Sequence, residues 1–226
     1  MKNKTLILVA FGFSGAAALI YEVVWTRSLS LLLGSTTYAL STMLSTFMAG
    51  LALGGLIGGR LADKGKNLLL FFGLFEMGIG VFGLITIPLI YAIPPLYLHI
   101  YKAFHLSPSL YFIFQFLLCL IIMLIPTTMM GATFPIVSKK ITTDMEGMGK
   151  SVGKAYSFNT VGAIIGSFSA GFVLIPTIGV KMTTITAAII NSLIALVIIV
   201  SALKKSRSVA VVSLMIGFVF AITAAI

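Results

Sequence analysis

The sequence predicts an all-α membrane protein with about seven transmembrane helices. Of its 226 residues, 59% are hydrophobic and only 9% are charged, and the mean hydropathy is +1.16. A soluble domain has about a quarter of its residues charged, because its surface faces water. The apolar residues also come in runs of about 20 or more, the length that a helix needs to cross the hydrocarbon of a bilayer. We therefore expect one transmembrane domain over residues 1–226, with the lipid bilayer as its main partner.

Glycines, prolines and charged clusters separate these runs and define the expected spans. The spans are 5–33, 36–61, 68–92, 109–136, 153–176, 181–203 and 208–226. The breaks are Gly34-Ser35-Thr36, Asp63 to Lys66, Pro94-Pro95, Ser107-Pro108 and Pro176 to Gly179. A competing interpretation makes residues 1–20 a cleaved signal peptide. The apolar run continues past Ala18 to Leu33, which favours a retained helix.

The basic residues predict the orientation of the chain. With the N-terminus in the cytoplasm, twelve of the 15 Lys and Arg residues fall on the cytoplasmic side. These are Lys2, Lys4, Arg60, Lys64, Lys66, Lys139, Lys140, Lys150, Lys154, Lys204, Lys205 and Arg207. Only Lys102 and Lys181 fall outside, and Arg27 lies at the outer end of the first span. This asymmetry is typical of cytoplasmic loops, and we expect a multi-pass protein of the cell (inner) membrane.

Composition also excludes several function classes. The net charge of +10 sits in short clusters between apolar runs, so we expect no nucleic-acid partner. The single Cys119 allows no intrachain disulfide, and no metal-binding spacing occurs. Gly147 to Ser151 is similar to a phosphate-binding loop, but Asp144 stands where its first glycine belongs, and no strand precedes it. We expect no cofactor, no metal and no catalytic residues, hence no enzyme in this chain.

Two carboxylates, Glu22 and Glu76, lie inside predicted spans. A charge at mid-bilayer costs at least about 2.5–3.5 kcal/mol on insertion scales, so it normally faces a partner or a water-filled cavity. One interpretation is that both line a path for a cation or a proton. The other is that Glu22 pairs with Arg27 or with another helix and stabilises the bundle. Glu76 has no basic neighbour in the sequence, which favours the functional interpretation there.

Aromatic and polar residues inside the spans are further candidates for a substrate site. Tyr21 and Trp25 are four apart and share a helix face with Glu22 nearby; the alternative for Trp25 is an aromatic belt at the membrane surface, with Arg27 reaching the headgroups. Tyr156 and Asn159 could also bind substrate. Interhelical hydrogen bonding is the commoner role for such groups, and the same applies to Thr160, Gln115 and Asn191.

Small residues at a spacing of four mark two helices for close packing. The second span has Gly50, Gly54 and Gly58 on one stripe, and the fifth span has Gly162 and Gly166. We expect these faces to pack tightly against other helices. The alternative is a surface that slides during transport, or one that serves only dimerisation.

The loop from Gly59 to Lys66 (GRLADKGK) resembles the signature between the second and third helices of major facilitator transporters. The match lacks one residue between Lys64 and Gly65, and Asn67 replaces the last basic residue. By this resemblance, Asp63, Arg60 and Lys64 would form a conformational latch between helices. The alternative is an ordinary loop salt bridge, which contributes little stability.

A second resemblance covers nearly the whole chain. Phe13 to Gly15, Tyr21 to Arg27, Leu33 to Thr36, Ala49 to Gly54, Pro126 to Pro135 and Tyr156 to Ala163 are similar, in this order, to the membrane domain of spermidine-synthase-like membrane proteins. In that family a facilitator-like helical domain is fused to an aminopropyltransferase, and no such soluble part is present in these 226 residues. The resemblance implies a six-helix facilitator half-bundle plus one extra helix, 208–226. Residues 5–92 and 109–203 would be its three-helix repeats.

Two functions remain open at this point. The first is a transporter or binding domain for a small organic cation such as a polyamine, bound by Glu22 and Glu76. The second is a membrane anchor or assembly domain for a spermidine-synthase-like enzyme. Because one facilitator half cannot enclose a central cavity, we also expect a homodimer.

Overall fold

The chain folds into a bundle of long helices. The computed structural model describes residues 2–34, 36–65, 67–104, 108–142 and 147–203. Their elements are α1 (Lys2–Leu33), α2 (Thr37–Lys64), α3 (Leu68–Phe104), α4 (Pro108–Ile141), α5 (Met148–Ser169), the π-helix η1 (Ala170–Leu174) and α6 (Ile175–Ala202). The described part of the chain is therefore all-helical, as predicted.

The expected count of seven spans is not supported. Five helical stretches are long and apolar enough to cross a membrane, and the last of them, Met148 to Ala202, contains a kink at Gly179. This stretch contains both spans predicted at 153–176 and 181–203; the helix continues through Pro176, and the break lies at Gly179, the end of the break predicted from Pro176 to Gly179. The chain turns back only at Gly179, whose φ of 77° suits glycine. The span predicted at 208–226 lies outside the described residues.

Other breaks follow from local chemistry. Gly34 ends α1 with φ 89°, and Thr36 caps α2, its hydroxyl accepting a hydrogen bond from Ala39 N–H at 3.2 Å. The break predicted at Pro94-Pro95 is wrong, because α3 continues through both prolines to Phe104. Proline inside a membrane helix is tolerated when neighbouring groups satisfy the freed carbonyls.

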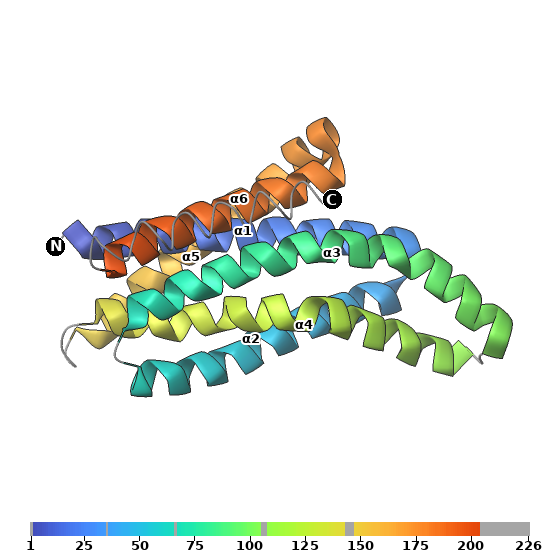
Figure 1. Ribbon diagram of the computed structural model, residues 1–226, viewed down its shortest axis with the longest axis horizontal. Helices are drawn as coiled ribbons and strands as arrows, with labels where there is room; N and C mark the ends of the chain where they lie inside the picture. The colour runs from blue at the N-terminus through green and yellow to red at the C-terminus, as the bar shows by residue number, and fades with distance from the viewer. Residues whose placement is uncertain (1, 35, 66, 105–107, 143–146, 204–226) are drawn as a thin grey trace.

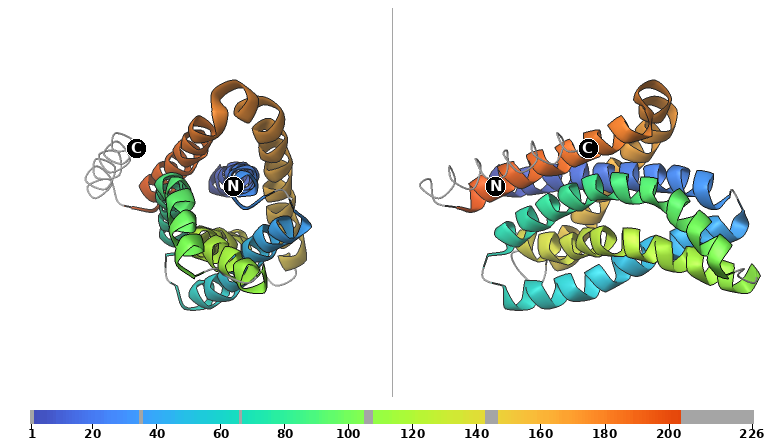
Figure 2. Two further views of the ribbon diagram at one scale, coloured as in Figure 1. Left: turned by 90° about the vertical axis from the view of Figure 1, so that its right-hand side faces the viewer. Right: turned by 45° about the vertical axis from the view of Figure 1, so that its right-hand side comes forward.

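The helices pack as three principal pairs. α2 lies mainly against α4, α1 against α5, and α3 against α6. Lesser contacts join α3 to α4 and α1 to α6. Figure 2 shows α5 and α6 joined as a hairpin around α1, which is the most enclosed helix.

Glycines bring the backbones of two of these pairs together. A methyl group added to Gly54 would lie 2.8 Å from Gly131 Cα of α4, closer than any ordinary contact. Gly50 and Gly58 likewise face Thr127 and Ala132 of α4. On α5, Gly162 and Gly166 face the backbone of Gly12 and Ala16 in α1. Both predicted glycine stripes thus pack inside this chain, so they are not available as dimer surfaces.

The ends of the helices segregate charge. α1 begins, α2 and α4 end, and α3 and α5 begin at the same end of the bundle (Figure 1). We call this the basic end, because Arg60, Lys64, Lys139, Lys140, Lys150 and Lys154 all belong to these termini. Large apolar side chains such as Leu44, Leu53 and Phe168 are exposed along the sides of the bundle. Such an outer surface is suited to lipid.

Candidate functional site

Glu76 lies in the centre of the bundle and is completely buried. Its Oε1 accepts a hydrogen bond from the Ser14 hydroxyl at 2.5 Å, and its Oε2 accepts one from Asn191 Nδ2 at 2.6 Å. These donors come from α1 and α6, so the carboxyl group of α3 links three helices. Both donors are neutral, and no described cation forms a salt bridge with Glu76.

The polar cluster around Glu76 contains an unused acceptor. Asn191 Oδ1 is buried without a hydrogen-bond partner. A buried polar atom without a partner costs about 1–3 kcal/mol, and such atoms are rare in folded proteins. The cluster of Ser14, Glu76 and Asn191 therefore has acceptor capacity for one more donor, such as a proton carrier or a small cation.

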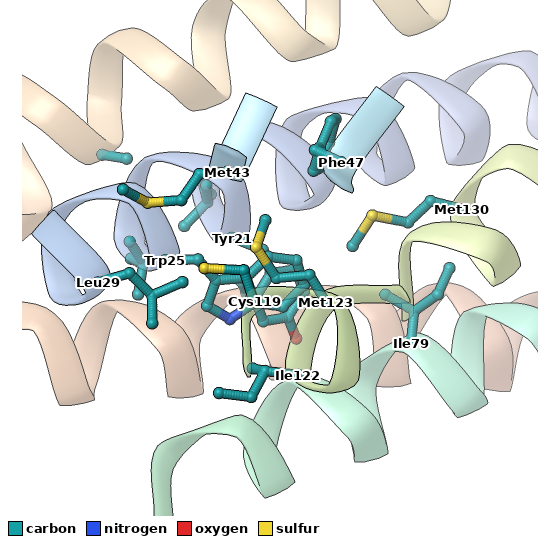
Figure 3. Packing of buried hydrophobic residues seen from close by; sticks show 14 of the residues in the cluster. Tyr21, Trp25, Leu29, Met43, Phe47, Ile79, Cys119, Ile122, Met123 and Met130 are labelled. Carbon is teal, nitrogen blue, oxygen red and sulfur yellow. The ribbon is translucent and has the colours of Figure 1, made fainter. Parts of the chain in front are cut away.

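Tyr21 and Trp25 line the same α1–α3 boundary farther from the basic end. Their rings stack with centroids 5.3 Å apart, and both side chains are fully buried among Met43, Cys119 and Met123 (Figure 3). Trp25 Nε1 donates to Thr86 Oγ1 at 3.0 Å. The interpretation of Trp25 as part of a surface belt is therefore wrong.

The Tyr21 ring is accommodated by a glycine. A methyl group at Gly83 of α3 would collide with the phenol ring of Tyr21, and the Tyr21 hydroxyl is buried without a partner. Along α1 and α3, the contact of Tyr21 with Gly83 lies seven residues beyond the contact of Ser14 with Glu76. At about 1.5 Å per residue this is about 10 Å along the helices, and the Tyr21 hydroxyl makes no hydrogen bond with Glu76.

Glu22 occupies a different environment. Its side chain is half-buried, whereas Arg27 is exposed, and no salt bridge joins these two described residues. Glu22 follows Tyr21 on α1, and its side chain is partly exposed whereas that of Tyr21 is fully buried. The structure thus does not combine Glu22 and Glu76 in one site.

The remaining substrate candidates lie apart from Glu76. Asn159 donates from Nδ2 to the Phe11 carbonyl at 3.1 Å, which joins α5 to α1. Tyr156 is 63% exposed on α5 and contacts the ring of Phe134 edge-on, with centroids 6.4 Å apart. Asn159 therefore has a packing contact, and Tyr156 faces outward.

Asp63, which was predicted to form a conformational latch with Arg60 and Lys64, instead forms a salt bridge with a residue of another helix. Asp63 Oδ1 accepts from Lys139 Nζ of α4 at 2.7 Å, whereas Arg60 and Lys64 have exposed side chains. In the sequence, Lys139 contributes only to the predicted orientation, and nothing there indicates its pairing with Asp63. Ser14 and Thr86 were missed as well, because single hydroxyls in apolar runs carry no distinctive pattern.

Two cavities accompany these groups. The first, of ≈ 250 Å³, lies between α1, α3 and α6, and its lining includes Val24, Thr86, Ile90 and Lys181 but no acid. The second, of ≈ 650 Å³, lies at the basic end, and its one acid is Asp63, paired with Lys139. Neither lining includes Glu22 or Glu76. Within the described ranges, no group of three His, Cys, Asp or Glu residues could hold a metal ion.

Comparison with known proteins identifies no relative of this chain. No protein-family model, no curated protein and no solved structure matches the chain.

Proposed function

We propose that this chain is a facilitator-like membrane domain in which Glu76 carries a proton or a small cation during transport. The observation that supports the proposal is a carboxyl group buried completely within an apolar span and bound only by the neutral donors Ser14 and Asn191. Ionisable groups in such positions are costly, and they mark ion pathways or proton relays in membrane proteins.

The pairing of helices supports a facilitator-like half-bundle. Exchanging α1, α2 and α3 with α4, α5 and α6 converts the α1–α5 contact into the α4–α2 contact and leaves the α3–α6 contact unchanged. The lesser contacts α3–α4 and α6–α1 also exchange. This is the pattern expected of two three-helix repeats with a pseudo-two-fold axis between them. The exchange leaves only the α3–α6 pair in place, so this pair lies on the axis. Glu76 of α3 and Asn191 of α6 belong to it, and their hydrogen bond therefore lies close to the axis.

The substrate proposed from the resemblance is an organic cation such as a polyamine. A polycation needs an unpaired anionic wall, and the two described cavities offer only Asp63, which is already paired. We therefore assign the charge at Glu76 to a proton or a single small cation. A binding cavity for spermidine would require a second half-bundle, and we propose that a second copy of the chain supplies it.

Flux in proteoliposomes tests the proposal. The wild-type protein is reconstituted with pyranine inside, and proton movement is followed after addition of spermidine outside, with radiolabelled spermidine uptake measured in parallel. Glu76→Gln retains the shape and an acceptor but not the charge, so we expect it to abolish ion movement while thermal stability stays near the wild-type value. Glu22→Gln is the matched control and should retain the proton signal.

Two outcomes would refute this function. Equal proton flux in Glu76→Gln and wild type would remove the role of the carboxyl group. Spermidine uptake that persists in Glu76→Gln and disappears in Glu22→Gln would show that the cation binds at Glu22 and not at Glu76.

A non-transporting anchor is the second candidate, and the packing favours it. Glu76 lines neither cavity, and Gly54, Gly58, Gly162 and Gly166 pack α2 and α5 closely against their neighbours. A rigid bundle of this kind could hold an enzyme at the membrane. An anchor gives no flux in the same assay with either variant or with the wild type.

A further inference from the structure

The smaller cavity lies at the end of the bundle opposite the basic end and is not used by the proposed function. Its volume is ≈ 250 Å³, and its walls are the last turns of α1, the segment of α3 from Thr86 to Pro94, and the start of the helical run that follows Gly179 in α6. Figure 1 shows the turn between α5 and α6 lifting away from the bundle at this end, while α1 and α3 continue. The cavity is therefore the space that α6 leaves uncovered beside α1 and α3.

The hydroxyl groups of the wall are already satisfied within the protein. Each of the three serine and threonine hydroxyls in the lining donates to a carbonyl of its own helix at 2.6–2.9 Å; they belong to Ser28, Thr86 and Thr184. The charged residue of the lining is the basic Lys181. The wall therefore provides no donor in search of an acceptor and no group that attracts a cation.

The other lining residues are mainly apolar and extend from a buried floor to an exposed rim. Val24 and Ile87 are 1% and 6% exposed, whereas Leu31 and Tyr91 are 66% and 68% exposed. Voids larger than a water molecule are few in protein interiors, because their lining atoms lose dispersion contacts. An apolar cavity of about 150 Å³ is known to bind small apolar molecules and to exclude water. This larger cavity is thus suited to an apolar group that enters from the side of the bundle.

The position of the rim identifies the apolar group. The cavity lies in the last turns of the apolar stretches Lys4–Leu31 and Leu68–Leu96, which are both long enough to cross a membrane. Amphipathic aromatic residues near the ends of such helices lie at the level of the lipid headgroups, and Tyr91 has this position on the rim. A lipid beside the rim therefore has its headgroup near Tyr91 and its acyl chains at the level of the cavity.

We propose that this cavity binds one acyl chain of a membrane phospholipid. The chain enters between Leu31 and Tyr91 and covers Ile87 and Ile90, and the headgroup stays outside the bundle. The bound chain replaces the contacts that α6 does not make. This site is independent of Glu76, because no acid lines the cavity.

Trp25 provides a built-in reporter for the site. It is the single tryptophan of the chain, it is fully buried, and its Nε1 donates to Thr86 Oγ1 in the cavity wall at 3.0 Å. The protein is reconstituted in phosphatidylcholine vesicles that contain a rising fraction of phosphatidylcholine with brominated acyl chains, which quench tryptophan at short range. We expect the quenching of Trp25 to saturate at a low fraction of brominated lipid.

Three variants of α3 test whether the occupied volume is the cavity. Ile90→Phe fills the cavity and excludes about two methylenes of the chain, so the affinity for the brominated lipid should fall about tenfold. Leu89→Phe is the matched control, because Leu89 is the exposed neighbour of Ile90 and does not line the cavity. Ile90→Ala widens the cavity and should retain the quenching.

Native mass spectrometry gives a second measurement that does not depend on the indole. We expect the wild type and Leu89→Phe to retain one phosphatidylcholine that Ile90→Phe loses. Equal quenching of the wild type and Ile90→Phe overturns the inference, as does equal loss of quenching in Ile90→Phe and Ile90→Ala. Quenching that disappears in Ile90→Phe while the lipid stays bound also overturns it, because the indole and not the acyl chain has then moved.

Discussion

Gly54 and Gly55 are neighbours on α2 that should respond in opposite directions to the same substitution. Gly54 faces α4, where an added methyl group would lie 2.8 Å from Gly131 Cα and from Ala132 N. Gly55 is one residue later, and a methyl group there meets nothing within 4 Å. The pair separates helix packing from helix propensity within one turn.

The size of each effect follows from this geometry. Ordinary contact begins at 3.4 Å, and the Thr128 carbonyl oxygen would lie closer to the methyl group than Gly131 Cα does, so Gly54→Ala requires α2 and α4 to part by more than 0.6 Å. A gap of about 0.5–1 Å removes a quarter to a half of the dispersion energy between facing atoms, and overpacking typically costs about 1–3 kcal/mol. Alanine gains about 0.5–1 kcal/mol over glycine inside a helix. We expect a net loss of about 1–2 kcal/mol for Gly54→Ala and a gain of about 0.5–1 kcal/mol for Gly55→Ala.

Reversible unfolding in mixed micelles, followed by circular dichroism, measures both variants under identical conditions. Gly58→Ala and Gly59→Ala repeat the comparison one turn later, since Gly58 faces Ala132 and Gly59 meets nothing within 4 Å. If Gly54→Ala proved as stable as Gly55→Ala, the close approach of α2 and α4 would be refuted.

Three further changes test other contacts. Asn191→Leu should cost about 1–3 kcal/mol, because Glu76 Oε2 loses its donor; the same change should cost much less in a Glu76→Leu background, and equal costs in a double-mutant cycle would contradict the hydrogen bond at 2.6 Å. Trp25→Phe should lose about 0.5–1.5 kcal/mol, the net value of its hydrogen bond to Thr86, and a neutral result in the unfolding assay would place the indole elsewhere. Asp63→Asn should change stability by about 0–1 kcal/mol, because Lys139 and Asp63 are 47% and 78% exposed; a larger loss that persists in high salt would show a buried pair.

The sequence predicted the class of the fold because composition acts on every residue. Low charge and long apolar runs require lipid contact whatever the packing, and Gly34 with Thr36 marked the end of α1 and the start of α2 correctly. The errors lie at proline. Pro94 and Pro95 read as a break in the sequence, but α3 continues through both. The break predicted from Pro176 to Gly179 does occur, at its glycine and not at its proline.

The candidate site was predictable only in part. Glu76 was recognisable because a carboxyl group in an apolar run is costly wherever it packs. Its partners were not, since Ser14 and Asn191 are 62 and 115 residues away in the sequence and only the folded bundle brings them together. The position of Trp25 was predicted wrongly because its residue type allows two environments. An amphipathic aromatic residue suits a membrane surface and also a core that contains one hydrogen-bond acceptor. Here Thr86 is that acceptor.

Lys139 shows the limit of counting charges. As one of twelve basic residues it contributed only to the predicted orientation. Its position on α4, directly opposite the end of α2, makes it the partner of Asp63 and part of the larger cavity. A charge count cannot distinguish such a residue from Lys140 beside it.

The arrangement of the helices across the membrane is the claim on which the functional account depends. In a Cys119→Ala background, Lys139→Cys at the basic end and Tyr91→Cys on the opposite half of α3 are labelled in intact cells with a membrane-impermeant maleimide. We expect Tyr91→Cys to react from outside, and Lys139→Cys to react only after the membrane is made permeable. Labelling of Lys139→Cys in intact cells, or of both positions from the same side, would contradict the account.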